Sequence, residues 1–126
     1  MGEHKAQSPQ ADLLFKAILS LKTTEECYDF FEDLCTMKEI ADMAQRVETA
    51  SMLLKGRTYE QIVKDVEIST ATISRINRCI QYGNGGYASI LNRIHAGEES
   101  TARPFAREAG LSFIYSKFFV ILCNLS

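Results

Sequence analysis

Residues 59–78, YEQIVKDVEISTATISRINR, decide the fold of this chain. Apolar residues recur there in two short runs at spacings of three and four, which puts them on one face of each of two helices. These residues are Ile62 and Val66, then Ile68 between the runs, then Ile73 and Ile76. The pattern predicts two helices joined by a tight turn, with Ile68 filling the angle where they cross.

The second of these helices carries a different chemistry on the face opposite its isoleucines. That face holds Ala71, Ser74, Arg75 and Arg78. Small side chains permit a partner to approach closely, and guanidiniums bind phosphate. The pattern is typical of a helix-turn-helix whose second helix, the recognition helix, enters the major groove of DNA. The alternative is that both arginines are solvated surface charges.

Charge is distributed unevenly along the chain. Its 126 residues are enough for one domain with its own core, and its net charge is −2. Residues 1–50 hold five Lys and Arg against ten Asp and Glu, whereas residues 51–93 hold six against three. The predicted DNA-binding segment therefore lies in the basic half, which fits nucleic-acid recognition. An ordinary scatter of surface charge is the alternative.

The residue inventory argues against metal, membrane and enzyme functions. The four cysteines form no C-x-x-C pair and His4 and His95 lie far apart, so we expect reduced cysteines and no zinc site. The N-terminus lacks the apolar region of a signal peptide and Lys117 interrupts the apolar tail, so we expect a cytoplasmic protein without a membrane span. No nucleophile is paired with a base, and no phosphate-binding glycine loop follows a strand, so we expect no enzyme.

Helical periodicity runs through most of the chain, and no segment up to residue 95 alternates as a strand does. In a capping box, a Thr and a Glu or Gln three residues later satisfy free backbone N–H groups at a helix start. Three boxes begin at Thr23, Thr36 and Thr58. Gly56 and Gly83 are expected to end helices. The sequence therefore predicts an all-α fold of about six helices.

The helical patterns also suggest how the chain is organised. Residues 1–10 are predicted to be a flexible N-terminus, with the first helix beginning near Asp12. Residues 11–95 form the predicted domain, with the helix-turn-helix at 59–82. Residues 96–126 are predicted to be a polar linker followed by an apolar extension of unknown role. A helical stripe in that extension allows an extra C-terminal helix.

Three short motifs resemble a known family: QRV at 45–47, LLKG at 53–56 and ATISR at 71–75. Around them, residues 11–95 are similar to the Trp repressor superfamily, in its YerC/YecD branch. The resemblance implies an intertwined homodimer that binds double-stranded DNA at a near-palindromic operator. It further implies a repressor of genes of the amino-acid-biosynthesis type. The alternative is a helical protein-interaction module that has kept the fold without DNA binding.

The resemblance also assigns DNA contacts. Contacts to bases fall on Thr70, Ala71 and Ser74 at the start of the recognition helix. The plain alternative is that these are only the first residues of a helix. From its place on the outer face, Arg78 is predicted to bind phosphate, and Arg75 is predicted either to do the same or to orient the recognition helix. Three further cations, Lys55, Arg57 and Lys64, either bind phosphate at the edges or are simply solvated.

The ligand site of the Trp repressor is only partly preserved. Its two ligand-binding arginines match Arg46 and Arg75, and its ligand-binding serine matches Cys79, a weaker hydrogen-bonding group. Its glycine, which admits the indole ring, matches Ile76. We therefore expect no response to tryptophan, no cofactor, and an open question over another small-molecule effector. For Arg46 the favoured alternative is an ion pair with Asp42 four residues earlier.

One residue departs from the usual helix-turn-helix pattern. The turn position that is commonly glycine, for its positive φ, is Glu67 here. A residue other than glycine costs about 1 kcal/mol in such a conformation. The sequence therefore predicts a strained turn held in place by the apolar residues around it.

Overall fold

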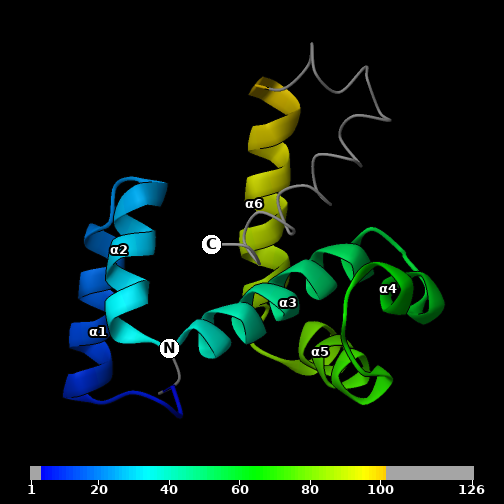
Figure 1. Cartoon of the computed structure of the whole chain (residues 1–126), viewed down its shortest axis with the longest axis horizontal. Helices are drawn as coiled ribbons and strands as arrows, with labels where there is room; N and C mark the ends of the chain where they lie inside the picture. Colours follow the sequence, from blue (N-terminus) through cyan, green and yellow to red (C-terminus); the bar gives the residue numbers. More distant parts are fainter. Residues whose placement is uncertain (1–3, 102–126) are drawn as a thin grey trace. The chain divides into compact units, whose positions relative to one another are not determined.

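The computed structural model describes residues 4–101, with side chains described up to residue 97. Six α-helices and no strand make up this part of the chain (Figure 1). In chain order they are α1 (Pro9–Ser20), α2 (Thr24–Leu34), α3 (Met37–Leu54), α4 (Tyr59–Asp65), α5 (Thr70–Tyr82) and α6 (Gly86–Thr101). The predicted all-α fold of about six helices is confirmed. The possible extra C-terminal helix lies outside the described residues.

The chain divides into two compact units, residues 1–48 and residues 49–126. The first unit contains α1, α2 and most of α3, and the second contains the end of α3 together with α4, α5 and α6. From the sequence, residues 11–95 are predicted to form one domain. Helical periodicity locates the helices but contains no signal for a boundary between compact units. Each unit is described separately below.

The second unit has an apolar core. Six apolar residues among those described are buried in it. They form two clusters, Ile62, Val66 and Ile73 in one and Ala50, Ile76 and Leu91 in the other. Ile68 packs against both clusters, so it fills the angle between α4 and α5 as predicted. Burial of an isoleucine side chain contributes about 2 kcal/mol, so these clusters hold the two helices at a fixed angle.

Local hydrogen bonds cap the N-termini of three helices at the residues that the sequence predicts. At Thr36 and Thr58 the capping box is complete, since the hydroxyl and the side chain three residues later each accept from a backbone N–H. At Thr23 the hydroxyl accepts from the N–H of Glu26 at 3.1 Å, but the Glu26 carboxylate accepts from the N–H of Lys22. All three predicted helix starts are confirmed. The box at Thr23 differs from the other two only in the N–H group that its glutamate binds.

The outermost helices are longer than the sequence predicts. α1 begins at Pro9 because the Ser8 hydroxyl accepts from the N–H of Ala11 at 3.0 Å and proline suits the first position of a helix. α6 continues past Gly97 to Thr101, through a segment predicted as linker. One glycine within a helix costs only about 1 kcal/mol, and the glutamates that follow it favour helix.

Two glycines end helices as predicted, for different reasons. Gly56, just after α3, has a φ of 81°, a left-handed conformation that favours glycine. Gly83, just after α5, has an ordinary φ, but a Cβ atom there would lie 2.4 Å from the carbonyl oxygen of Cys79. A close approach of the backbone therefore requires glycine at the end of α5.

The prediction of a strained turn between α4 and α5 is wrong. No described residue other than glycine has a positive φ, so Glu67 is not left-handed. The N–H of Ile68 donates to the carbonyl of Val66 at 2.9 Å, which makes a three-residue γ-turn centred on Glu67. The inverse form of this turn has a negative φ that any L-residue adopts. The chain bends here without the penalty that a left-handed residue would carry.

The first unit has no comparable core. No described residue from 4 to 48 is buried. Large apolar side chains protrude from α1, where Leu13 is 69% exposed and Leu19 is 84% exposed. On α2, Phe30 and Phe31 are half-buried and meet edge to face, with ring centroids 5.7 Å apart. The helices form as predicted, but the single chain leaves their apolar faces partly uncovered.

Candidate nucleic-acid interface

The outer face of α5 presents every residue that the sequence predicts to contact bases. Thr70, Ala71 and Ser74 are all exposed. On the inner face, Ile73 is 0% and Ile76 is 3% exposed. The helix is anchored by one face and open on the other, which is the arrangement that a recognition helix needs. Its first turn is fixed by the Ser69 hydroxyl, which accepts from the N–H of Thr72 at 3.2 Å.

The predicted phosphate-binding cations are exposed and have no anionic partner. They are Lys55, Arg57, Lys64, Arg75 and Arg78. In the part of the chain that the structure describes, the one ion pair joins Lys38 to Asp42, within the first unit. These five cations are therefore available to phosphate, since none forms an ion pair with a carboxylate of the described residues.

The prediction that Asp42 pairs with Arg46 is wrong. The Asp42 carboxylate binds the Lys38 ammonium at 3.2 Å instead. Both cations lie four residues from Asp42, on the same side of α3, so they compete for one carboxylate and the lysine occupies it. Arg46 is exposed on α3 in the first unit.

The positions on α5 that are assigned to a tryptophan ligand differ in their exposure. The Ile76 side chain is buried in a cluster with Ala50 and Leu91, as the sequence predicts from its inward spacing. Arg75 and Cys79, its neighbours among the assigned positions, are both exposed to solvent. Apolar side-chain atoms therefore occupy the space where a glycine would leave room.

Two side-chain contacts in the second unit are not predicted by the sequence. Asn77 Nδ2 donates to Tyr59 Oη at 3.3 Å, joining α5 to α4. Ser51 Oγ and His95 Nε2 lie 3.1 Å apart, joining α3 to α6. The partners are 18 and 44 residues apart. Periodicity detects only neighbours on one helix, so neither pair leaves a sequence signal.

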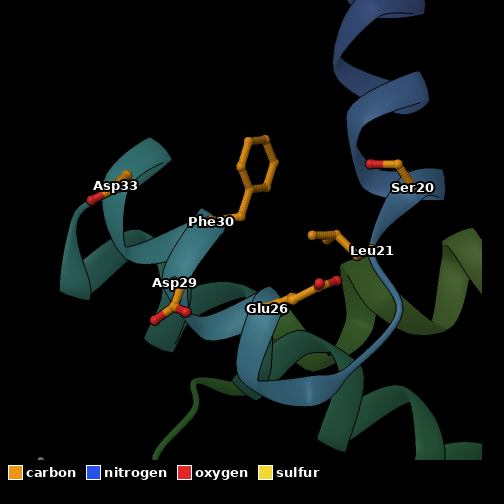
Figure 2. A pocket seen from close by; sticks show the side chains of 6 residues that line it. All are labelled: Ser20, Leu21, Glu26, Asp29, Phe30 and Asp33. Carbon is orange, nitrogen blue, oxygen red and sulfur yellow. The ribbon is translucent and has the colours of Figure 1, made fainter.

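A hollow of about 410 Å³ lies on the first unit, where α1 gives way to α2. Figure 2 shows Leu21 and Phe30 directed toward the same space, with the Glu26 carboxylate beside Leu21, and three residues of α2 contribute carboxylates to the lining. These carboxylates are Glu26, Asp29 and Asp33. Ser20 completes the lining, and none of the six lining residues is a cation, so the hollow combines apolar side chains with acidic ones.

The described residues contain neither a cluster of metal-binding side chains nor a membrane-spanning helix. Within residues 4–101, no three His, Cys, Asp or Glu side chains are grouped as metal ligands. Over the same range, no helix combines the length and the apolar character needed to cross a bilayer. The described cysteines, Cys27, Cys35 and Cys79, are free thiols.

Fold and interface together define a helix-turn-helix protein with an exposed recognition helix edged by cations. The chain belongs to the Trp repressor protein family, whose model matches residues 9–95. It is 49% identical over 98 residues to the uncharacterized protein YerC of Bacillus subtilis (strain 168). That match covers 78% of this chain and 94% of YerC.

Solved structures agree with this assignment. A candidate Trp repressor from Staphylococcus aureus is 47% identical, with a TM-score of 0.70, over 72% of this chain and 91% of that one. A TrpR-like protein from Eubacterium eligens ATCC 27750 is 49% identical, with a TM-score of 0.70, over 72% and 94% of the two chains. The resemblance drawn from the sequence is confirmed. It places the chain in a family of helix-turn-helix DNA-binding regulators, not a family of enzymes.

Proposed function

We propose that this protein is a sequence-specific DNA-binding regulator that acts as a homodimer on a near-palindromic operator in the bacterial cytoplasm. The observation that carries the proposal is the arrangement of α5. Its Ile73 and Ile76 side chains are buried, while its outer face is open and flanked by cations that have no ion-pair partner among the described residues. The Ala71 methyl group suits the methyl group of thymine, and the hydroxyls of Thr70 and Ser74 suit polar base edges. Arg75, Arg78 and the edge cations Lys55, Arg57 and Lys64 supply phosphate contacts, which give affinity without sequence choice.

The homodimer accounts for the uncovered side chains of the first unit. Leu13, Phe15 and Leu19 of α1 are each more than half exposed, and a second copy offers the same apolar surfaces in return. Two recognition helices related by a two-fold axis then meet half-sites about one helical turn apart. Bound in this way, the dimer excludes RNA polymerase, so we propose repression.

The proposed targets are genes of the amino-acid-biosynthesis type, as the family resemblance implies. Tryptophan itself is not the proposed effector, because the buried Ile76 side chain fills the place of the glycine that would admit an indole ring. We expect added tryptophan to leave DNA binding unchanged. An effector of another chemistry would act by changing the spacing of the two recognition helices, which must match the groove repeat.

Selection of bound DNA from random sequence, followed by mobility shift at two salt concentrations, tests the proposal. We expect one enriched, near-palindromic sequence. Ala71→Leu is expected to abolish the preference without unfolding the protein, since Leu and Ala have similar helix propensities. Ala96→Leu, at an exposed alanine of α6, is the matched control and is expected to leave selection unchanged. Absence of any enriched sequence contradicts the proposal, and a protein partner captured independently of DNA favours an interaction module instead.

A further inference from the structure

The two helices of the helix-turn-helix are joined by one polar bond as well as by their apolar core. Asn77, in the second half of α5, donates its side-chain N–H to the phenol oxygen of Tyr59, the first residue of α4, at 3.3 Å. Among the described residues this is the one side-chain hydrogen bond between these two helices. Beside it, the buried cluster of Ile62, Val66 and Ile73 packs the two helices together.

The Tyr59 ring is held in place from two sides. Its carbon atoms pack against the buried cluster of Ile62, Val66 and Ile73, which leaves the residue half-buried. Asn77, also half-buried, holds the phenol oxygen from the side of α5. A tyrosine fixed both by packing and by a hydrogen bond presents its hydroxyl in one orientation, with little entropy left to lose when it binds a partner.

The register of α5 places this hydroxyl beside the predicted DNA-binding face. Asn77 follows Ser74 by three residues, so both lie on neighbouring parts of one helix surface. Arg78, a predicted phosphate contact, is the next residue along α5. The Tyr59 hydroxyl therefore lies at the flank of the recognition helix, where a DNA backbone runs once the helix enters the groove.

The chemistry of the bond leaves one group available. An amide N–H only donates, so the phenol oxygen of Tyr59 acts as the acceptor and keeps its own O–H as a donor. Among the described residues, the bond from Asn77 is the one hydrogen bond in which the Tyr59 hydroxyl takes part. A phosphate oxygen only accepts, and tyrosine hydroxyls are among the groups that bind the DNA backbone.

We infer that Tyr59 binds a DNA phosphate through its hydroxyl and that Asn77 positions it, so that the pair sets how deeply the recognition helix is seated. The inference rests on the proposed function. The Tyr59 contact is uncharged, so it adds affinity and register but releases no counterion. In this respect it differs from the contacts predicted for Arg75 and Arg78.

The test compares Tyr59→Phe with the wild type on DNA selected by the wild-type protein. A hydrogen bond to a charged group is worth about 1.5–3 kcal/mol, so we expect affinity to fall roughly 10-fold to 100-fold with an unchanged salt slope. Asn77→Ala keeps the Tyr59 hydroxyl but removes the hydrogen bond that orients it. We expect this variant to lose less DNA affinity, about 3-fold. Tyr87→Phe is the matched control, because Tyr87 is also half-buried against an apolar cluster. It is expected to bind as the wild type does.

A second measurement separates a phosphate contact from a brace that merely stiffens the protein. Each phosphate of a half-site is replaced in turn by an uncharged methylphosphonate. One replacement is expected to weaken the wild type but not Tyr59→Phe, since that variant has already lost the contact. Equal losses for both proteins at every position, or equal affinity of Tyr59→Phe and wild type for unmodified DNA, would overturn the inference. A wild type that binds no DNA would overturn the proposed function itself.

Discussion

The two units of this chain differ in how much of their apolar surface is buried. The second unit encloses Ile62 and Ile73 completely, at 0% exposure each, within a few short helices. The first unit buries none of its described residues and leaves Leu19 84% exposed. The first unit is also acidic, whereas residues 51–93 carry an excess of cations. Among the described residues, one unit has a closed apolar core, and the other leaves its large apolar side chains exposed or half-buried.

This difference assigns a separate task to each unit under the proposed function. A recognition helix must be rigid before it meets DNA, and the closed core of the second unit makes it so. A dimerisation surface must stay open in the single chain, and the first unit is open. Substitutions in the two units are therefore expected to affect different measurements.

The largest expected effect is in the core of the second unit. Ile62→Ala removes a fully buried side chain, and such truncations cost about 3 kcal/mol in the free energy of unfolding. Chemical denaturation measures the loss. Val63→Ala, one residue later and 44% exposed, is the matched control, for which we expect less than about 1 kcal/mol. Similar losses for both variants would contradict the closed core.

The next largest effect is expected in the first unit, and in association instead of folding. Leu13→Ala combined with Leu19→Ala removes two protruding side chains of α1 that we place in the dimer. Apolar anchors of an interface contribute about 2 kcal/mol, so the dimer dissociation constant is expected to rise at least about 10-fold. Sedimentation equilibrium measures it against the 14.2 kDa mass of a single chain. A wild type that is monomeric at all concentrations would contradict the dimer.

A smaller effect of opposite sign is expected at Thr49, the first residue of the second unit. Its hydroxyl is fully buried and has no hydrogen-bond partner among the described residues. An unsatisfied buried hydroxyl is destabilising, so Thr49→Val, which keeps the shape, is expected to raise the free energy of unfolding by about 1 kcal/mol. Thermal unfolding measures the gain. A loss of stability would instead show that the assembled protein supplies a partner for the hydroxyl.

The smallest expected effect tests the difference in charge between the acidic first unit and the basic segment of the second unit. Arg78→Ala is expected to weaken binding to all DNA sequences about equally and to lower the salt slope of the affinity by about 1, because one phosphate contact is lost. Mobility shifts across a salt series measure the slope. Lys22→Ala, which removes an exposed cation from the first unit, is expected to leave the slope unchanged. An unaltered slope for Arg78→Ala would remove this arginine from the interface.

The parts of the fold that the sequence predicts are those fixed by neighbours along the chain. The boxes at Thr36 and Thr58 use partners three residues away, and the burial of Ile73 and Ile76 follows from helical spacing. The exposure of Ala71 and Ser74 follows from the same spacing, seen from the other side of the helix.

What the sequence does not predict depends on competition or on distance. Asp42 can form an ion pair with either Lys38 or Arg46, and the two pairs are nearly equal in energy, so the sequence does not predict that Lys38 binds. The bond between Tyr59 and Asn77 needs the crossing angle of two helices, which no local pattern contains. The open first unit escapes prediction because an apolar stripe looks the same whether its own chain or a second chain covers it.

The inverse γ-turn at Glu67 has a practical consequence. Many templates for this motif demand glycine at the bend, and such a template passes over a chain that turns through a bond from Ile68 to Val66. Because the bend makes no demand on its central side chain, a cysteine introduced at 67, in a variant whose exposed Cys79 thiol is replaced by serine, is a suitable attachment point for a fluorophore. The fluorescence of such a label, placed between α4 and α5, would change when DNA binds.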